Sequence, residues 1–249
     1  MLRFLCLLAV LLPRIVLADC MSELLTVWPS LDNPLPANGQ VVLQGYGDFR
    51  EAVATVSERS PRLVSEKDEV PLRVVAVYRG EFRLSQAVLQ PARPLQPGQR
   101  YALRLTQSES AAAPVLPIEE GVKEKPIAWT VAEADTKPPR WREVPRKMGE
   151  KAERWGCGPV IFVDVSASVD EDGPEVQVLA EVRRADSGKP VRFRLTPSKE
   201  KVAVGHSMCS GAFRLEEGVR YTVRLVAVDM AGNESAAPGD AVLIEGPSL

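Results

Sequence analysis

Alternating apolar and polar residues predict β-strands along most of this chain. The clearest run extends from Tyr221 to Ala227, where Tyr, Val, Leu and Ala at every second position can face a core. The run stops at Asp229–Asn233, because Gly and Asn tolerate positive φ and Asp can bond its own backbone. We therefore expect a strand, a turn and a returning strand at 241–244.

Similar runs of β-forming residues recur from residue 24 onward, and no segment has the period of a long helix. Pro, Gly and Asn separate the runs and interrupt regular structure between them. The predicted fold class is all-β with antiparallel sheets. Further strands are expected at 24–28, 40–43, 72–78, 82–89, 100–106, 127–131, 160–165, 176–182, 191–195 and 202–204.

One strand pattern occurs twice. LQPGQRYALRL at Leu95–Leu105 matches LEEGVRYTVRL at Leu215–Leu225, with Leu, Gly, Arg, Tyr, Arg and Leu at identical spacing and an offset of 120 residues. That offset is about the size of one β-sandwich domain, so it indicates a duplication. Tyr101 and Tyr221 are then expected as tyrosine corners, in which the hydroxyl group bonds the backbone at a bend.

The repeated LxxGxRYxxRL, together with YTVRLVAVDMAGNES in the second half, resembles bacterial immunoglobulin-like and fibronectin type III modules. PANGQVVL at 36–43 is similar to the opening strands of such domains. The resemblance implies two tandem antiparallel immunoglobulin-like sandwiches, used as spacers, adhesive units or accessory domains. It implies no catalytic residues.

The composition changes between the two halves. Residues 135–155 are rich in proline and charge, and basic side chains outnumber acidic ones around Trp141 and Trp155. We prefer a solvated linker whose tryptophans pack between the domains to a site for an anionic polymer. The expected domains are 19–134 and 155–249, joined by a linker at 135–154 that could include a first strand.

Residues 1–18 are typical of a secretory signal peptide. Arg3 precedes an apolar run at Phe4–Leu12, and Val16-Leu17-Ala18 offers a small-residue cleavage site. The run is too short for a membrane span. Residues 1–18 carry two arginines and no acid, so their removal leaves 29 basic and 33 acidic residues, a net charge of −4 that argues against nucleic acid as a partner.

The cysteines suggest two modifications. Leu17-Ala18-Asp19-Cys20 resembles the lipobox of bacterial lipoproteins, in which the Cys is lipidated, although Asp19 stands where that motif has a small residue. A lipid anchor at Cys20 and plain cleavage after Ala18 both stay open. Cys157 and Cys209 are placed to form a disulfide within the second domain in an oxidising compartment. The bond would close a loop of 53 residues and stabilise the folded state by roughly 4 kcal/mol.

The residues do not predict an enzyme, a cofactor or a metal site. His206 is the chain's one imidazole, and Ser207 beside it is too close in sequence for triad geometry. Zinc-binding spacings are absent from the sequence. Asp170-Glu171-Asp172 is interpreted as an acidic turn in preference to a calcium loop.

We therefore expect an exported, non-enzymatic binding or structural protein of the cell envelope, with an envelope protein or a polysaccharide as partner. One alternative is a periplasmic chaperone of the pilus-assembly kind, although residues 19–30 lack the Arg or Lys that such chaperones use. A carboxylate-based carbohydrate-active enzyme is the least favoured alternative. A binding loop, if present, is expected at the AGNES turn, residues 231–235.

Overall fold

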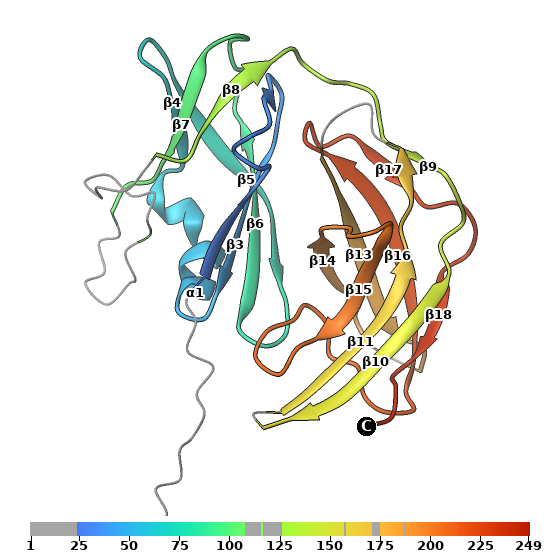
Figure 1. Cartoon of the computed structure of the whole chain (residues 1–249). Helices are drawn as coiled ribbons and strands as arrows, with labels where there is room; N and C mark the ends of the chain where they lie inside the picture. The colour runs from blue at the N-terminus through green and yellow to red at the C-terminus, as the bar shows by residue number, and fades with distance from the viewer. Residues whose placement is uncertain (1–23, 108–115, 117–125, 157, 171–174, 187) are drawn as a thin grey trace, which may run out of the picture.

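The computed structural model describes residues 24–107, 116, 126–156, 158–170, 175–186 and 188–249 (Figure 1). Nearly all regular structure in these residues is β, in antiparallel sheets that form two sandwiches, so the predicted fold class is confirmed. The signal-peptide segment 1–18, Cys20 and Cys157 lie outside the described residues.

The first sandwich is joined into one continuous path of strands, β1-β3-β6-β5-β4-β7-β8-β2. Strand β5 connects its two layers, because Glu69–Pro71 pair with β4 while Leu72–Arg79 pair with β6. The elements are β1 (Leu24–Trp28), β2 (Leu35–Pro36), β3 (Val41–Tyr46), α1 (Phe49–Ala54), the 3₁₀ turn η1 (Val56–Arg59), β4 (Arg62–Val64), β5 (Glu69–Arg79), β6 (Leu84–Pro91), β7 (Arg100–Arg104) and β8 (Ala128–Ala132).

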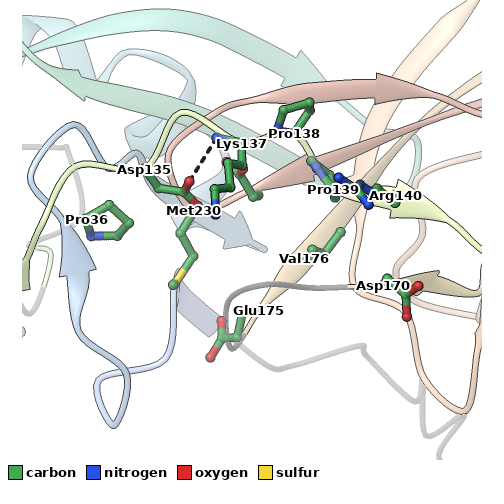
Figure 2. A pocket seen from close by; sticks show the side chains of 11 residues that line it. Pro36, Asp135, Lys137, Pro138, Pro139, Arg140, Asp170, Glu175, Val176 and Met230 are labelled. Atoms are coloured by element: carbon green, nitrogen blue, oxygen red, sulfur yellow. Dashed lines mark hydrogen bonds between the residues drawn. The ribbon is translucent and has the colours of Figure 1, made fainter.

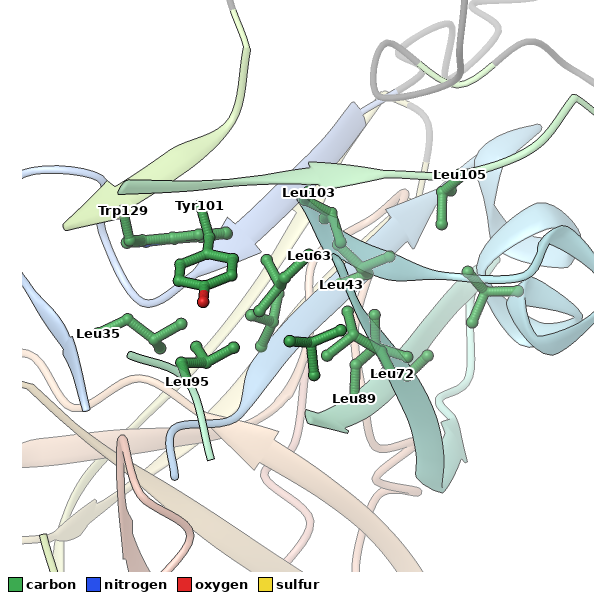
Figure 3. Packing of buried hydrophobic residues seen from close by; sticks show 14 of the residues in the cluster. Leu35, Leu43, Leu63, Leu72, Leu89, Leu95, Tyr101, Leu103, Leu105 and Trp129 are labelled. Carbon is green, nitrogen blue, oxygen red and sulfur yellow. The ribbon is translucent and has the colours of Figure 1, made fainter. Parts of the chain in front are cut away.

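The core of the first sandwich contains many leucines around two neighbouring aromatic residues, Tyr101 and Trp129 (Figure 3). Tyr101 and Trp129 are fully buried, on neighbouring strands where they pair directly. The Trp129 indole nitrogen donates to the carbonyl oxygen of Pro29 at 3.1 Å, which ties β8 to the segment after β1. Gly45 lets α1 approach β3, since a Cβ atom there would lie 2.3 Å from the Phe49 carbonyl oxygen.

The second sandwich has one sheet ordered β10-β11-β15 and another ordered β14-β13-β16-β17, with β18 also paired to β16. Two layers of this kind, with alternating inward residues, are the immunoglobulin-like architecture. The strands are β9 (Arg140–Trp141), β10 (Lys147–Trp155), β11 (Gly158–Ser166), β12 (Val169–Asp170), β13 (Val176–Arg184), β14 (Val191–Leu195), β15 (Lys201–His206), β16 (Arg220–Asp229), β17 (Glu234–Ala236) and β18 (Val242–Glu245).

The run at 221–227 behaves as its alternation predicts. Tyr221, Val223, Leu225 and Ala227 are buried, and all but Ala227 belong to the cluster that forms the core of the second sandwich. The turn that follows is closed by Asp229, whose Oδ1 accepts the backbone N–H groups of Ala231 and Asn233 at 2.8 and 2.9 Å.

Candidate functional site

In the described residues, the joint between the two sandwiches combines apolar packing with buried hydrogen bonds. Its apolar residues belong to clusters that both domains share. Tyr46 and Leu84, which face outward from the first sandwich, belong to the core cluster of the second. Met230 of the second sandwich is enclosed by Trp28, Val42 and other residues of the first. The outer face of the sheet formed by β1, β3, β6 and β5 is therefore covered by the second sandwich.

A buried glutamine forms hydrogen bonds across this joint. The side chain of Gln86 on β6 is 2% exposed and meets the backbone of Arg194 on the edge strand β14. Its Oε1 accepts the Arg194 N–H at 3.0 Å, and its Nε2 donates to the Arg194 carbonyl oxygen at 2.9 Å and to Gln44 Oε1 at 2.8 Å. Gln86 thus occupies the backbone positions that a neighbouring strand would use and covers the β14 edge.

The Arg194 side chain is also buried in the joint, with 4% exposure. Its Nη2 donates to Gln40 Oε1 at 3.0 Å, whereas Nε and Nη1 have no hydrogen-bond partner among the described residues. Burial lowers the pKa of this guanidinium group, and the neighbouring Tyr78 opposes that shift. Alternation in VRFRL places Arg194 on the outer face of its sheet, but the sequence carries no signal that another domain covers this face.

A small pocket of about 30 Å³ lies where the linker crosses the joint (Figure 2). Acidic side chains dominate its polar lining, but each is already used within the chain. The pocket is lined by Pro36, Asp135, Lys137, Pro138, Pro139, Arg140, Asp170, Glu175, Val176, Asp229 and Met230.

One of these carboxylates, Glu175, bonds the first domain, whereas Asp229 accepts hydrogen bonds from its own turn. Glu175 of the second sandwich accepts the backbone N–H of Ser30 at 3.1 Å and the side-chain amide of Asn33. Burial raises the pKa of Asp229, and hydrogen bonds from Asn233 and Ala231 oppose the rise. The described residues contain no group of three or more His, Cys, Asp or Glu side chains that could hold a metal ion.

The AGNES turn, where a binding loop was expected, is part of this joint. A Cβ atom on Gly232 would lie 2.3 Å from Gln40 Nε2, and the Asn233 side-chain amide donates to the Asp135 carbonyl oxygen at 3.3 Å. Trp141 Nε1 donates to the Ser235 carbonyl oxygen at 2.9 Å. The turn therefore packs against the first domain and the linker, which leaves it unsuited to act as a free loop.

A second pocket, of about 190 Å³, opens at the opposite end of the second sandwich and includes Glu81 of the first. Its lining includes apolar side chains such as the buried Phe213, the carboxylates of Glu81 and Glu216, and two cations, Lys189 and Arg214, that form no ion pair within the described part of the chain. Apolar side chains beside two such cations suit an organic anion, and the two carboxylates in the same lining oppose that preference.

The two repeated tyrosines occupy equivalent places, each as the second residue of its strand, Tyr101 in β7 and Tyr221 in β16. The Tyr221 hydroxyl accepts the Glu216 backbone N–H at 2.9 Å, five residues earlier. The Tyr101 hydroxyl accepts the Gln96 N–H at 3.4 Å and donates to Asp68 Oδ2 at 2.7 Å. Desolvation and the bond to Asp68 raise the pKa of Tyr101.

The other residues singled out from the sequence are dispersed. Cys209 is disulfide-bonded to a partner outside the described residues, so its pairing with Cys157 stays a prediction. His206 is 3% exposed and stacks on Phe82 of the first sandwich, with ring centroids 4.0 Å apart. Burial lowers its pKa.

The prediction that both tryptophans of 135–155 pack between the domains was wrong. Trp141 packs against the core of the second sandwich, and Trp155 is 54% exposed near the end of the β10–β11 hairpin. Within the described residues, no helix is long and apolar enough to cross a membrane.

No protein-family model matches the chain, and no curated protein matches it. Structures similar to parts of it include a pullulanase type I from Bacillus subtilis (11% identity, 84% of this chain and 25% of that chain, TM-score 0.25). Others are the FN1–FN3 domains of chicken CNTN1 (8%, 86% and 66%, 0.29) and a two-domain fibronectin type III segment of chicken tenascin (14%, 90% and 98%, 0.25). The chain spans about a quarter of the pullulanase and about two thirds of the CNTN1 segment.

Proposed function

We propose that this protein is an exported, non-enzymatic binding or structural unit in which two immunoglobulin-like sandwiches act as one rigid body. The observation that carries the proposal is the sealed joint: Gln86 of one domain bonds both backbone groups of Arg194 in the other. Flexible tandem modules need no such bond, because inter-domain contacts within a chain are by default small and mobile. A fixed joint suits a protein that holds its surfaces at constant separation.

The partner proposed is an envelope protein or polysaccharide, and an anchor at Cys20 would keep the protein at the membrane. An anionic group on that partner could bind Lys189 and Arg214, which line the second pocket together with apolar side chains such as Phe213. This pocket includes residues of both domains, so its shape depends on the same joint.

The test uses the purified protein and isolated envelope fractions. Wild type is expected to co-sediment with one fraction, such as an insoluble polysaccharide, without releasing reducing ends or peptides from it. Lys189→Ala/Arg214→Ala should weaken that co-sedimentation at least several-fold, whereas Lys199→Ala, on an exposed turn outside the pocket, should not. Release of a cleaved product would establish an enzyme and overturn the proposal, as would absence of binding to every fraction.

A further inference from the structure

Strand β10, Lys147–Trp155, is an exposed edge of the second sandwich. One side of it pairs with β11 from Lys147 opposite Val165 to Trp155 opposite Gly158. No strand in the described part of the chain pairs with its other side, although β18 lies close to part of β10 (Figure 1). Side chains along the strand are exposed, except for the half-buried Gly149 and Ala152. Backbone N–H and C=O groups of alternate residues are therefore open to another strand.

The order of charges along this edge is complementary to the same order in a second, antiparallel copy of the strand. In an antiparallel pairing with a second copy centred on Ala152, Lys151 lies opposite Glu153 of that copy and Glu150 lies opposite Arg154. The two-fold axis repeats both pairs, so all four charged side chains face a charge of opposite sign. Such cross-strand pairs stabilise antiparallel sheets, and like charges in the same positions destabilise them.

Neighbouring registers lose this complementarity. Residues opposite each other in an antiparallel pair point to the same face, so a two-fold axis perpendicular to the sheet must pass through a residue, and the neighbouring registers are centred on Lys151 or on Glu153. Centres one full residue away, on Lys151 or on Glu153, leave no pair of opposite charges between 150 and 154. Charge thus selects the register centred on Ala152 among its neighbours.

An exposed aromatic residue fits the same register. Trp155 is 54% exposed, and its Nε1 donates to Glu153 Oε2 at 2.9 Å, which holds the indole along the strand. In the pairing centred on Ala152, Trp155 of one copy lies opposite Gly149 of the other, where an added Cβ atom would meet nothing within 4 Å. Covering an edge glycine with a cross-strand aromatic residue is a known stabilising arrangement in sheets, and it would bury this indole.

Charges and a bulge on an edge strand also serve to prevent pairing, and β10 has both, with the bulge between Lys147 and Gly149. Preventing strand pairing requires only charged side chains on the edge. It does not require the alternation of acidic and basic residues found on β10, nor an indole opposite Gly149. We propose that β10 pairs antiparallel with β10 of a second copy about a two-fold axis at Ala152, giving a continuous sheet β15-β11-β10-β10-β11-β15 across a homodimer.

Sedimentation of the purified protein at low salt tests the dimer. Wild type should form dimers as its concentration rises towards about 1 mM, the range of a weak complex. Lys151→Glu places like charges opposite Glu153 twice in each dimer and should raise the dissociation constant at least tenfold. Lys151→Glu/Glu153→Lys restores opposite charges and should restore dimerisation. Melting temperature reports whether each variant is folded.

Cross-linking tests the register. A cysteine at Ala152→Cys would lie opposite its own copy, with Cβ atoms about 5 Å apart, within reach of a disulfide. Met148→Cys is the matched control: Met148 is 54% exposed on the same strand, but in this register it is displaced from its copy by eight residues, roughly 26 Å. Disulfide dimers are expected with Ala152→Cys and not with Met148→Cys. A strictly monomeric wild type, or equal cross-linking of both variants, would overturn the proposal.

Discussion

Replacing Gln86 by alanine removes the bonds that seal the domain joint. The change leaves the Arg194 N–H and C=O groups without their present partner and also frees Gln44 Oε1. Because Gln86 is 2% exposed, these groups are shielded from bulk water in the native protein. We therefore expect the substitution to destabilise the native state and to weaken coupling between the two sandwiches.

The magnitude follows from the two backbone groups. A buried donor or acceptor left unsatisfied costs about 1–3 kcal/mol, so the pair sets a range of about 2–6 kcal/mol. Water entering the space vacated by the side chain would satisfy part of this need. The expected loss in free energy of unfolding is about 3 kcal/mol.

Urea denaturation and calorimetry provide the assay. Wild type should unfold in one transition, and Gln86→Ala should unfold at lower urea in two, because the sandwiches then separate before both unfold. Gln86→Leu keeps the volume without the bonds and should behave like alanine, whereas Gln90→Ala, on the same strand but half-buried and away from Arg194, should lose little. A single transition within 0.5 kcal/mol of wild type would refute the role assigned to Gln86.

The other predictions concern the tyrosine corners and the histidine. Tyr221→Phe should lower the free energy of unfolding by about 1 kcal/mol, measured in urea, because only the bond to the Glu216 N–H is lost; an unchanged midpoint would contradict this. Tyr101→Phe should reduce the acid dependence of stability. The pKa of Asp68 is lowered first by Arg93 and then by Tyr101, so the Asp68 carboxylate stabilises the fold above its ordinary pKa of 3.8. That stabilisation is lost as the pH falls through the lowered pKa. Burial of His206 lowers its pKa from 6.5, so stability should fall as pH drops below about 6.5, and His206→Gln should flatten a plot of unfolding free energy against pH in that range.

The strands that bury one face were predictable from the sequence. The run at 24–28 coincides with β1, and that at 191–195 coincides with β14. In both runs, β-branched or aromatic residues are buried in a core or under the neighbouring domain. The repeat located both tyrosines near the start of equivalent strands, β7 and β16. These successes share one cause: a period of two is visible wherever a single face meets a core.

Strand β10 was not predictable in this way. Its residues are exposed on both faces, so burial imposes no alternation on KMGEKAERW. The six-residue helix α1 escaped for a different reason, since it is too short to show a helical period and is held by packing against Gly45.

The domain joint was hidden as well. Gln86 and Arg194 lie on outward positions of their strands, which the pattern assigns to solvent, and only the other domain makes them interior. The one indication of the joint came from Trp28, Tyr46 and Met230. These residues are apolar, and neither sandwich alone buries them completely.

The glutamine that covers the β14 edge has a consequence for the order in which the protein is made. The first sandwich precedes the second in the chain, so we expect it to fold first and to be present when β14 forms. Expressed without residues 24–132, the second sandwich would present β14 as a bare edge and a sheet face bearing Met230, and it should accumulate in insoluble aggregates. The first sandwich would therefore protect the β14 edge of the second from pairing with other chains.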